Sequence, residues 1–94
     1  MVKQTTDQPN EQLYRLFWDF YGPAAQQTAE HFARHLTQWF EREDERANVV
    51  DQGVDQYGPN HSAVFCLIPE RLSKSCISAL KPRRGGPDLS LIHI

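Results

Sequence analysis

The sequence predicts a single α+β domain in which two helices cover one face of a three-stranded sheet, in the order β-α-β-β-α. Three patterns predict this fold: an aromatic-rich alternating stretch, a long apolar stripe of helical spacing after it, and a continuous apolar run in the second half. A chain of 94 residues is long enough for one compact core. We place the domain at residues 12–82.

The first strand is predicted over LYRLFWDFY, from Leu13 to Tyr21. It follows residues 1–11, which are polar and aperiodic, so we expect a flexible lead-in there. Within the strand, two alternating sets of residues lie on opposite faces of the sheet. The fully apolar set is Tyr14, Leu16, Trp18 and Phe20. The mixed set is Leu13, Arg15, Phe17 and Asp19.

A long amphipathic helix is predicted after Gly22 and Pro23, because proline suits the first helical position. Its apolar residues recur at spacings of three and four. They are Ala25, Ala29, Phe32, Leu36, Trp39 and Phe40. The helix is expected to end near Arg42, within the charged stretch EREDER, and its stripe must cover a sheet.

Two strands and a second helix are predicted in the rest of the chain. The polar, β-branched stretch NVVDQGVDQ (48–56) is typical of an edge strand, and Gly53 indicates a bulge. After the turn YGPN (57–60), the run HSAVFCLI (61–68) predicts a buried central strand. The second helix follows from Glu70 to Lys81, before Pro82. Its predicted stripe is Leu72, Cys76, Ala79 and Leu80.

This order of elements predicts a ferredoxin-like arrangement whose fourth strand is missing or truncated. A right-handed crossover makes the first two strands parallel, with the third between them and antiparallel to both. A fourth strand would follow the second helix and pair beside the first strand. We expect RRGGPD (83–88) to be a loop leading to it.

The last six residues, LSLIHI (89–94), are interpreted as a sequencing-adapter translation that is not native. The nucleotide string CTG TCT CTT ATA CAC ATC encodes them, and it resembles a transposase end sequence used to prepare sequencing libraries. We therefore expect a metagenomic or transcript source and a truncated C-terminus, with the authentic sequence lost after about Asp88.

Composition favours a cytoplasmic protein. The formal net charge is −2, which provides no positive field for nucleic acid or anionic lipid. No apolar stretch is long enough for a membrane span or a signal sequence, so we expect no membrane association. Cys66 and Cys76 lack the spacing of a metal site, so we expect two buried free thiols.

The sequence contains no motif for catalysis or cofactor binding, so we predict no catalytic residue, no cofactor and no metal. Neither G-x-S-x-G nor a phosphate-binding glycine loop is present. An enzyme of unknown reaction is kept as a further alternative function. His31 and His35 have the spacing of a chelating pair on a helix, but the sequence shows no neighbouring third ligand, and we interpret them as structural or solvated histidines.

The favoured function is protein–protein association through the sheet face that the helices leave open, with a homodimer as the simplest assembly. The partner-binding residues that we predict are Arg15, Phe17, Phe65 and Ile77. If the strand register differs by one residue, Val64 lies on the open face in place of Phe65. Ile77 is included because it falls off the apolar stripe of its helix.

A small-ligand or nucleic-acid binding module is the alternative. It would use Arg15 and Phe17 together with the basic residues of KPRR, which are Lys81, Arg83 and Arg84. An exposed ring on an open sheet resembles RNA-recognition modules in arrangement. Their glycine- and aromatic-rich signature is missing and the net charge is negative, so nucleic acid is not favoured.

Overall fold

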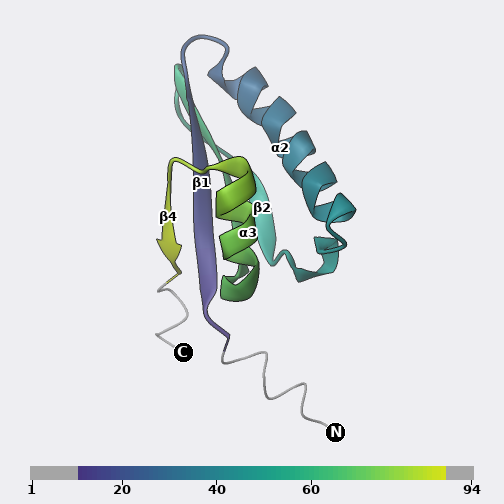
Figure 1. Ribbon diagram of the computed structural model, residues 1–94. Helices are drawn as coiled ribbons and strands as arrows, with labels where there is room; N and C mark the ends of the chain where they lie inside the picture. The colour runs from purple at the N-terminus through teal and green to yellow at the C-terminus, as the bar shows by residue number, and fades with distance from the viewer. Residues whose placement is uncertain (1–10, 89–94) are drawn as a thin grey trace, which may run out of the picture.

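The computed structural model describes residues 11–88 and contains four strands and two α-helices in that range. In chain order the elements are β1 (Leu13–Tyr21), α2 (Ala25–Arg42), the 3-10 turn η2 (Arg46–Asn48), β2 (Asp51–Gly58), β3 (His61–Pro69), α3 (Glu70–Leu80) and β4 (Arg84–Pro87). The α+β class is therefore confirmed (Figure 1). The segment 89–94, which we interpreted as an adapter translation, and nearly all of the predicted lead-in lie outside the described residues.

The four strands form one antiparallel sheet in the order β2-β3-β1-β4. As predicted, β3 lies between β1 and β2. It is paired along its whole length, from Tyr21↔His61 to Leu13↔Pro69 on the β1 side. The apolar run of β3 is therefore explained by its central place, where five of its residues are completely buried or nearly so: Ser62, Ala63, Val64, Cys66 and Ile68.

The expectation of a three-stranded sheet with a loop at residues 83–88 is wrong. Arg84–Pro87 forms β4, which pairs with β1 from Phe17↔Arg84 to Tyr14↔Pro87. The sequence RGGP has no alternation and no β-branched residue, so no local pattern predicts a strand. The unpaired edge of β1 supplies the partner, and proline is tolerated because β4 is itself an edge strand.

Gly85 allows β4 to approach β1 closely. A Cβ atom at this position would lie 2.6 Å from Leu16 Cδ2 and 2.9 Å from the carbonyl oxygen of Arg15. A side chain at the neighbouring Gly86 would meet nothing within 4 Å. The first of the two glycines is therefore required by packing, whereas the second is not.

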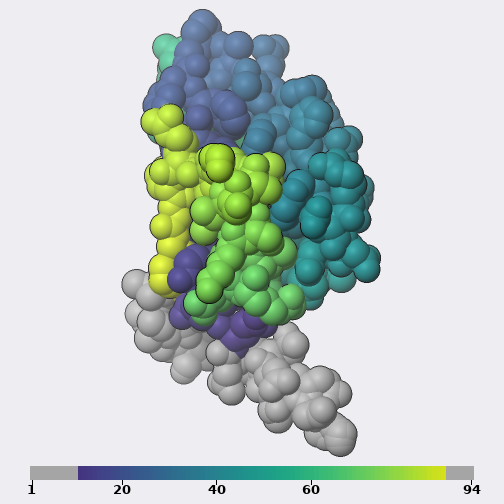
Figure 2. Space-filling model, in the orientation of Figure 1, coloured from purple at the N-terminus to yellow at the C-terminus, as the bar shows by residue number. Residues whose placement is uncertain are grey.

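Both helices pack on the same face of the sheet, and their apolar stripes form the core with it. The core residues are Leu16, Trp18, Ala29, Leu36, Trp39, Phe40, Val64, Cys66, Ile68, Leu72 and Cys76. The indole N–H of Trp18 donates to the carbonyl oxygen of Leu80 over 2.9 Å, which ties the end of α3 to β1. Ser73 takes the buried place predicted for Ala79, which is exposed. Figure 2 shows α2 and α3 side by side over the sheet, with β4 along its rim.

β2 differs from its prediction in position and in the place of its bulge. The strand spans Asp51–Gly58, and Gly53 pairs regularly with Phe65. A Cβ atom on Gly53 would lie 3.0 Å from Phe65 Cε2, so the glycine leaves room for that ring. The register shift comes later, between Gln56 and Gly58, and it involves Tyr57.

No helix within residues 11–88 has the length and apolar character needed to cross a bilayer.

Candidate functional site

The sheet face turned away from the helices, called the open face below, is the candidate site. Strand pairing arranges its residues in rows across the sheet. The first row is Asp51, Leu67, Arg15 and Gly86. The second is Gly53, Phe65, Phe17 and Arg84. The third is Asp55, Ala63 and Asp19, and the last pairs His61 with Tyr21, beside Tyr57.

The structure brings three of the four predicted partner-binding residues together. Phe17 pairs directly with Phe65, and Arg15 lies next to both of them. This register excludes Val64, which is fully buried in the core. Ile77 does not belong to this group, because it lies on α3, on the opposite side of the sheet. There it is 42% exposed and lines a small cavity with Tyr14 and Pro82.

Both phenylalanine rings of the open face are covered by arginine side chains. The guanidinium carbon of Arg84 lies 4.2 Å from the ring centre of Phe17. That of Arg15 lies 5.4 Å from the ring centre of Phe65. Such cation–π contacts hold the arginine stems over the apolar centre of the face. A partner therefore meets guanidinium groups first, and stacking of a nucleic-acid base on either ring would require an arginine to move.

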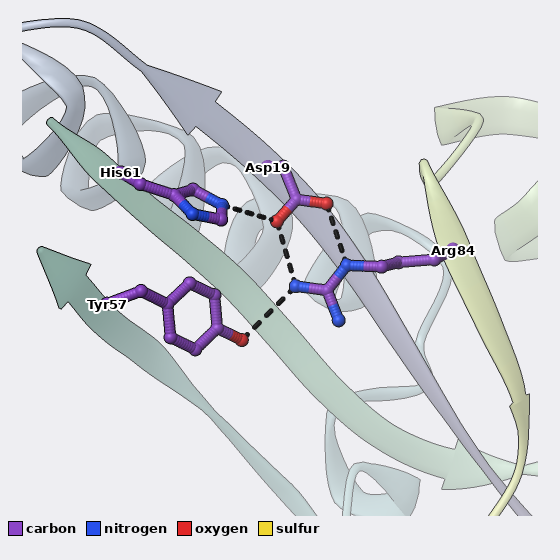
Figure 3. A network of polar contacts seen from close by, with 4 residues as sticks. All are labelled: Asp19, Tyr57, His61 and Arg84. Carbon is purple, nitrogen blue, oxygen red and sulfur yellow. Dashed lines mark hydrogen bonds and ion pairs between the residues drawn. The ribbon is translucent and has the colours of Figure 1, made fainter.

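A polar network beside these rings contains one residue from each of the four strands: Asp19, Tyr57, His61 and Arg84 (Figure 3). Arg84 donates from Nε and Nη2 to the two oxygens of Asp19, over 2.8 Å in each case. His61 Nε2 lies 3.0 Å from Asp19 Oδ1. Arg84 Nη2 also donates to the hydroxyl of Tyr57 over 3.2 Å. We call these four residues the Asp19 network.

Asp19 carries the negative charge at the centre of this network. Its side chain is 5% exposed, and burial alone would raise its pKa. The hydrogen bonds from Arg84 outweigh burial and, with the His61 contact, lower the pKa of Asp19 to about 2. In return, the bonds to Asp19 and to Tyr57 raise the pKa of Arg84. Asp19 is therefore ionised and Arg84 charged at all physiological pH values.

Tyr21, Tyr57 and His61 form an aromatic group at one end of the open face. Tyr21 stacks on His61 with ring centres 4.4 Å apart, and Tyr57 meets the same ring edge-on at 4.7 Å. The alternation that places Asp51, Gly53 and Asp55 on the open face also places Tyr57 there, and its hydroxyl reaches Arg84 across the sheet. Both tyrosines are at least half exposed, at 65% for Tyr21 and 50% for Tyr57.

The contacts of the Asp19 network orient its side chains and pair opposite charges. An aspartate that orients a histidine also occurs in general-base pairs. Here, however, Asp19 is shared with Arg84, and neither of the two described cavities, lined by Ile77 and by Arg71, is lined by Asp19 or His61. Within residues 11–88, no three His, Cys, Asp or Glu side chains are grouped to hold a metal ion.

The residues of the nucleic-acid alternative do not form one basic surface. Lys81 ends α3 with a left-handed φ of 51° and donates from Nζ to the Ser78 carbonyl oxygen. Arg83 is exposed and directly precedes β4. Arg84 lies on the open face and is neutralised by Asp19. The three side chains are therefore divided between the end of a helix, an edge and a sheet face.

Sequence reasoning missed Asp19, Tyr57 and His61 as site residues. Alternation along the first strand does place Asp19 on the face of Arg15 and Phe17, and this signal could have been used. The contact of Asp19 with Arg84 depends on a strand that no local pattern predicts. Tyr57 was missed because it belongs to β2, whereas its local sequence looks like the start of a turn.

Comparison with known proteins adds no candidate. No protein-family model, curated protein or solved structure matches this chain. The residues of the open face are therefore the basis for inferring a function.

Proposed function

We propose that this protein is an association module that forms a homodimer through its open face. The observation that carries the proposal is the composition of that face. Its side chains include two arginines, two phenylalanines and two tyrosines, which are Arg15, Arg84, Phe17, Phe65, Tyr21 and Tyr57. Within the described residues, no lysine or glutamate lies on this face. Protein interfaces are enriched in these residue types and depleted in lysine and glutamate.

Within residues 11–88, the exposed lysines and glutamates lie instead on the two helices and directly after their C-terminal ends. Glu30, Glu41 and Glu43 are exposed along α2 and at its end, and Lys74 is exposed on α3. These side chains have high conformational entropy, which association through the helical surface would have to restrict. The contrast between the two sides of one small domain favours the open face for association.

A second copy is the occupant that we propose, because the charges of the first row complement themselves. Arg15 lies on β1 and Asp51 on β2, with Leu67 between them. A twofold axis parallel to the strands reverses the order of strands across the face. It therefore brings Asp51 of each copy toward Arg15 of the other, so that unlike charges meet twice.

Arg15 contributes more to this pairing than Arg84. The carboxylate of Asp19 already neutralises Arg84 through two bonds of 2.8 Å. Arg15 makes one ion pair with Asp88, and the N···O distance is 3.9 Å. Asp51 accepts a hydrogen bond from the backbone N–H of its neighbour Gln52 and is otherwise exposed.

The edge of the sheet formed by β4 is less suited to association than the face. β4 has four residues, and Pro87 cannot donate a backbone hydrogen bond to an added strand. A short edge with proline resists pairing with another chain. Association by strand addition at β4 is therefore disfavoured.

We include two finer statements in the proposal. The first is a ferredoxin-like arrangement, which the strand order β2-β3-β1-β4 and the two connecting helices support. The second is a cytoplasmic location, supported by the two free cysteines, Cys66 and Cys76, because such thiols persist in reducing compartments.

Sedimentation equilibrium tests the homodimer. We expect the wild-type chain to be dimeric at about 100 μM, well above a dissociation constant in the low micromolar range. Arg15→Glu and Asp51→Arg should each be monomeric, since each places like charges opposite one another. Lys74→Glu and Glu43→Arg are matched charge reversals on the helical side, and both should remain dimeric.

Mixing the two monomeric variants tests the proposed twofold axis parallel to the strands. In a complex of Arg15→Glu with Asp51→Arg, every first-row contact joins unlike charges again, so an equimolar mixture should form a heterodimer. A monomeric wild-type chain at about 100 μM, or a mixture that stays monomeric while wild type dimerises, contradicts the proposal. Binding of single-stranded RNA by a monomeric wild-type chain would replace it with the nucleic-acid alternative.

A further inference from the structure

His31 and His35 lie one turn apart on the exposed side of α2, and the structure brings their ring nitrogens into contact. The Nε2 atoms are 2.9 Å apart, and the rings meet edge-on with centres separated by 4.5 Å. Both side chains are exposed. The pair belongs to the helical side of the molecule, so it is independent of the open face and of the homodimer.

The separation of the two nitrogens matches the span of two neighbouring positions around a metal ion. Bonds from imidazole nitrogen to a divalent first-row metal are about 2.0–2.1 Å long. Two such bonds at about 90° place their nitrogens about 2.9 Å apart. A metal ion bound by both Nε2 atoms would therefore keep them at their present separation.

We propose that His31 and His35 form a two-histidine chelating site for a divalent first-row transition ion such as Ni²⁺ or Cu²⁺. Imidazole nitrogen suits these ions, whereas Mg²⁺ and Ca²⁺ require oxygen ligands. The positions one turn away on the same helix hold neutral glutamines, Gln27 and Gln38, and no carboxylate. Water completes the coordination, so the site is one for weak and reversible binding.

Arg34 opposes the ion in the present arrangement. Its Nη2 atom lies 3.3 Å from His31 Nδ1, where the guanidinium acts as the donor. His31 then carries its proton on Nε2, the atom that must bind the metal. Metal binding requires the other tautomer, with the proton on Nδ1 and without the bond to Arg34. A carboxylate in place of Arg34 would instead accept from Nδ1–H and strengthen the site.

Titration calorimetry with NiCl₂ in a non-coordinating buffer tests the inference. Every variant carries His93→Ala, because that histidine lies outside the described residues. We expect one Ni²⁺ per chain in this background, and a loss of affinity of at least about tenfold in His31→Ala and in His35→Ala, because each retains one ligand of a chelate. His61→Ala is the matched control and should bind Ni²⁺ as the background does.

A second variant tests the geometry around His31. Arg34→Glu should increase the Ni²⁺ affinity by roughly tenfold, as an outer carboxylate does for a metal-bound histidine. Thermal unfolding provides a separate readout, since Ni²⁺ bound to the folded state should raise the melting temperature of the background and not that of His35→Ala. Unchanged Ni²⁺ affinity in both histidine variants, or a loss in His61→Ala instead, would overturn the inference.

Discussion

Arg84 of β4 and Asp19 of β1 form a bidentate ion pair on the open face. Nε and Nη2 of Arg84 are each 2.8 Å from a different carboxylate oxygen of Asp19. β4 has four residues and contributes two glycines and a proline besides Arg84. Its side chains therefore supply little apolar contact, and the ion pair is the principal side-chain link between β4 and the sheet.

Replacing Asp19 by asparagine should destabilise the domain by about 1–3 kcal/mol, because Arg84 and His61 lose a buried charged acceptor. Urea unfolding measures the change, and hydrogen exchange of the Gly86 and Asp88 amides should report faster opening of β4. Asp55→Asn is the control, since Asp55 lies in the same row, is exposed and has no ion pair within the described residues. Equal stability of the two variants would show that the ion pair does not fasten β4.

The Asp19 network should also make stability depend on pH in the acid range. The pKa of Asp19 is about 2 in the folded chain, below its ordinary value of 3.8. A lowered pKa contributes stability that is complete above the ordinary value and is lost as the pH falls from about 4 toward 2. The loss should be about 1–2 kcal/mol, because solvent reduces the interaction at the half-exposed Arg84.

Urea unfolding at pH 7, 4 and 2.5 checks this dependence. The difference in unfolding free energy between wild type and Asp19→Asn should be constant from pH 7 to near 4 and should shrink at pH 2.5. Asp55→Asn should follow wild type through the whole range. A difference that is as large at pH 2.5 as at pH 7 would exclude the lowered pKa of Asp19.

Gly85 and Gly86 should respond differently to alanine. Gly85→Ala forces a methyl group against Leu16 and the Arg15 carbonyl, so we expect a loss of about 1–3 kcal/mol. Gly86→Ala has free space and should be neutral or slightly stabilising, because alanine restricts the unfolded chain. Thermal unfolding compares the stability of the two variants directly. If Gly85→Ala leaves the stability unchanged, β4 does not approach β1 this closely.

The thiols of Cys66 and Cys76 should react slowly in the folded protein. Both side chains are completely buried, and the hydrogen bond to Cys76 together with burial raises the pKa of Cys66. With 5,5′-dithiobis(2-nitrobenzoate) at pH 8, we expect reaction at the rate of unfolding in buffer and immediate reaction of two thiols in urea. Rapid modification of either thiol in buffer would contradict the packing of β3 against α3.

The sequence by itself determined the elements whose apolar residues repeat with a clear period. The alternation from Leu13 to Tyr21 marks β1, the run from His61 to Ile68 marks β3, and the stripe from Ala25 to Phe40 marks α2. The patterns of β1 and α2 also state which side of the element is buried, so the helix-covered face and the open face with Arg15 and Phe17 could both be predicted. The continuous run of β3 does not, and it left Val64 and Phe65 as alternatives.

The tertiary structure alone decided β4, the place of the bulge and the Asp19 network. Arg84–Pro87 is a strand because the edge of β1 offers it hydrogen bonds, and no residue of RGGP prefers an extended chain for its own sake. The network joins residues that are up to 65 positions apart, as with Asp19 and Arg84. Their contact depends on strand order and register, which are set by packing between elements and leave no periodic trace in the chain.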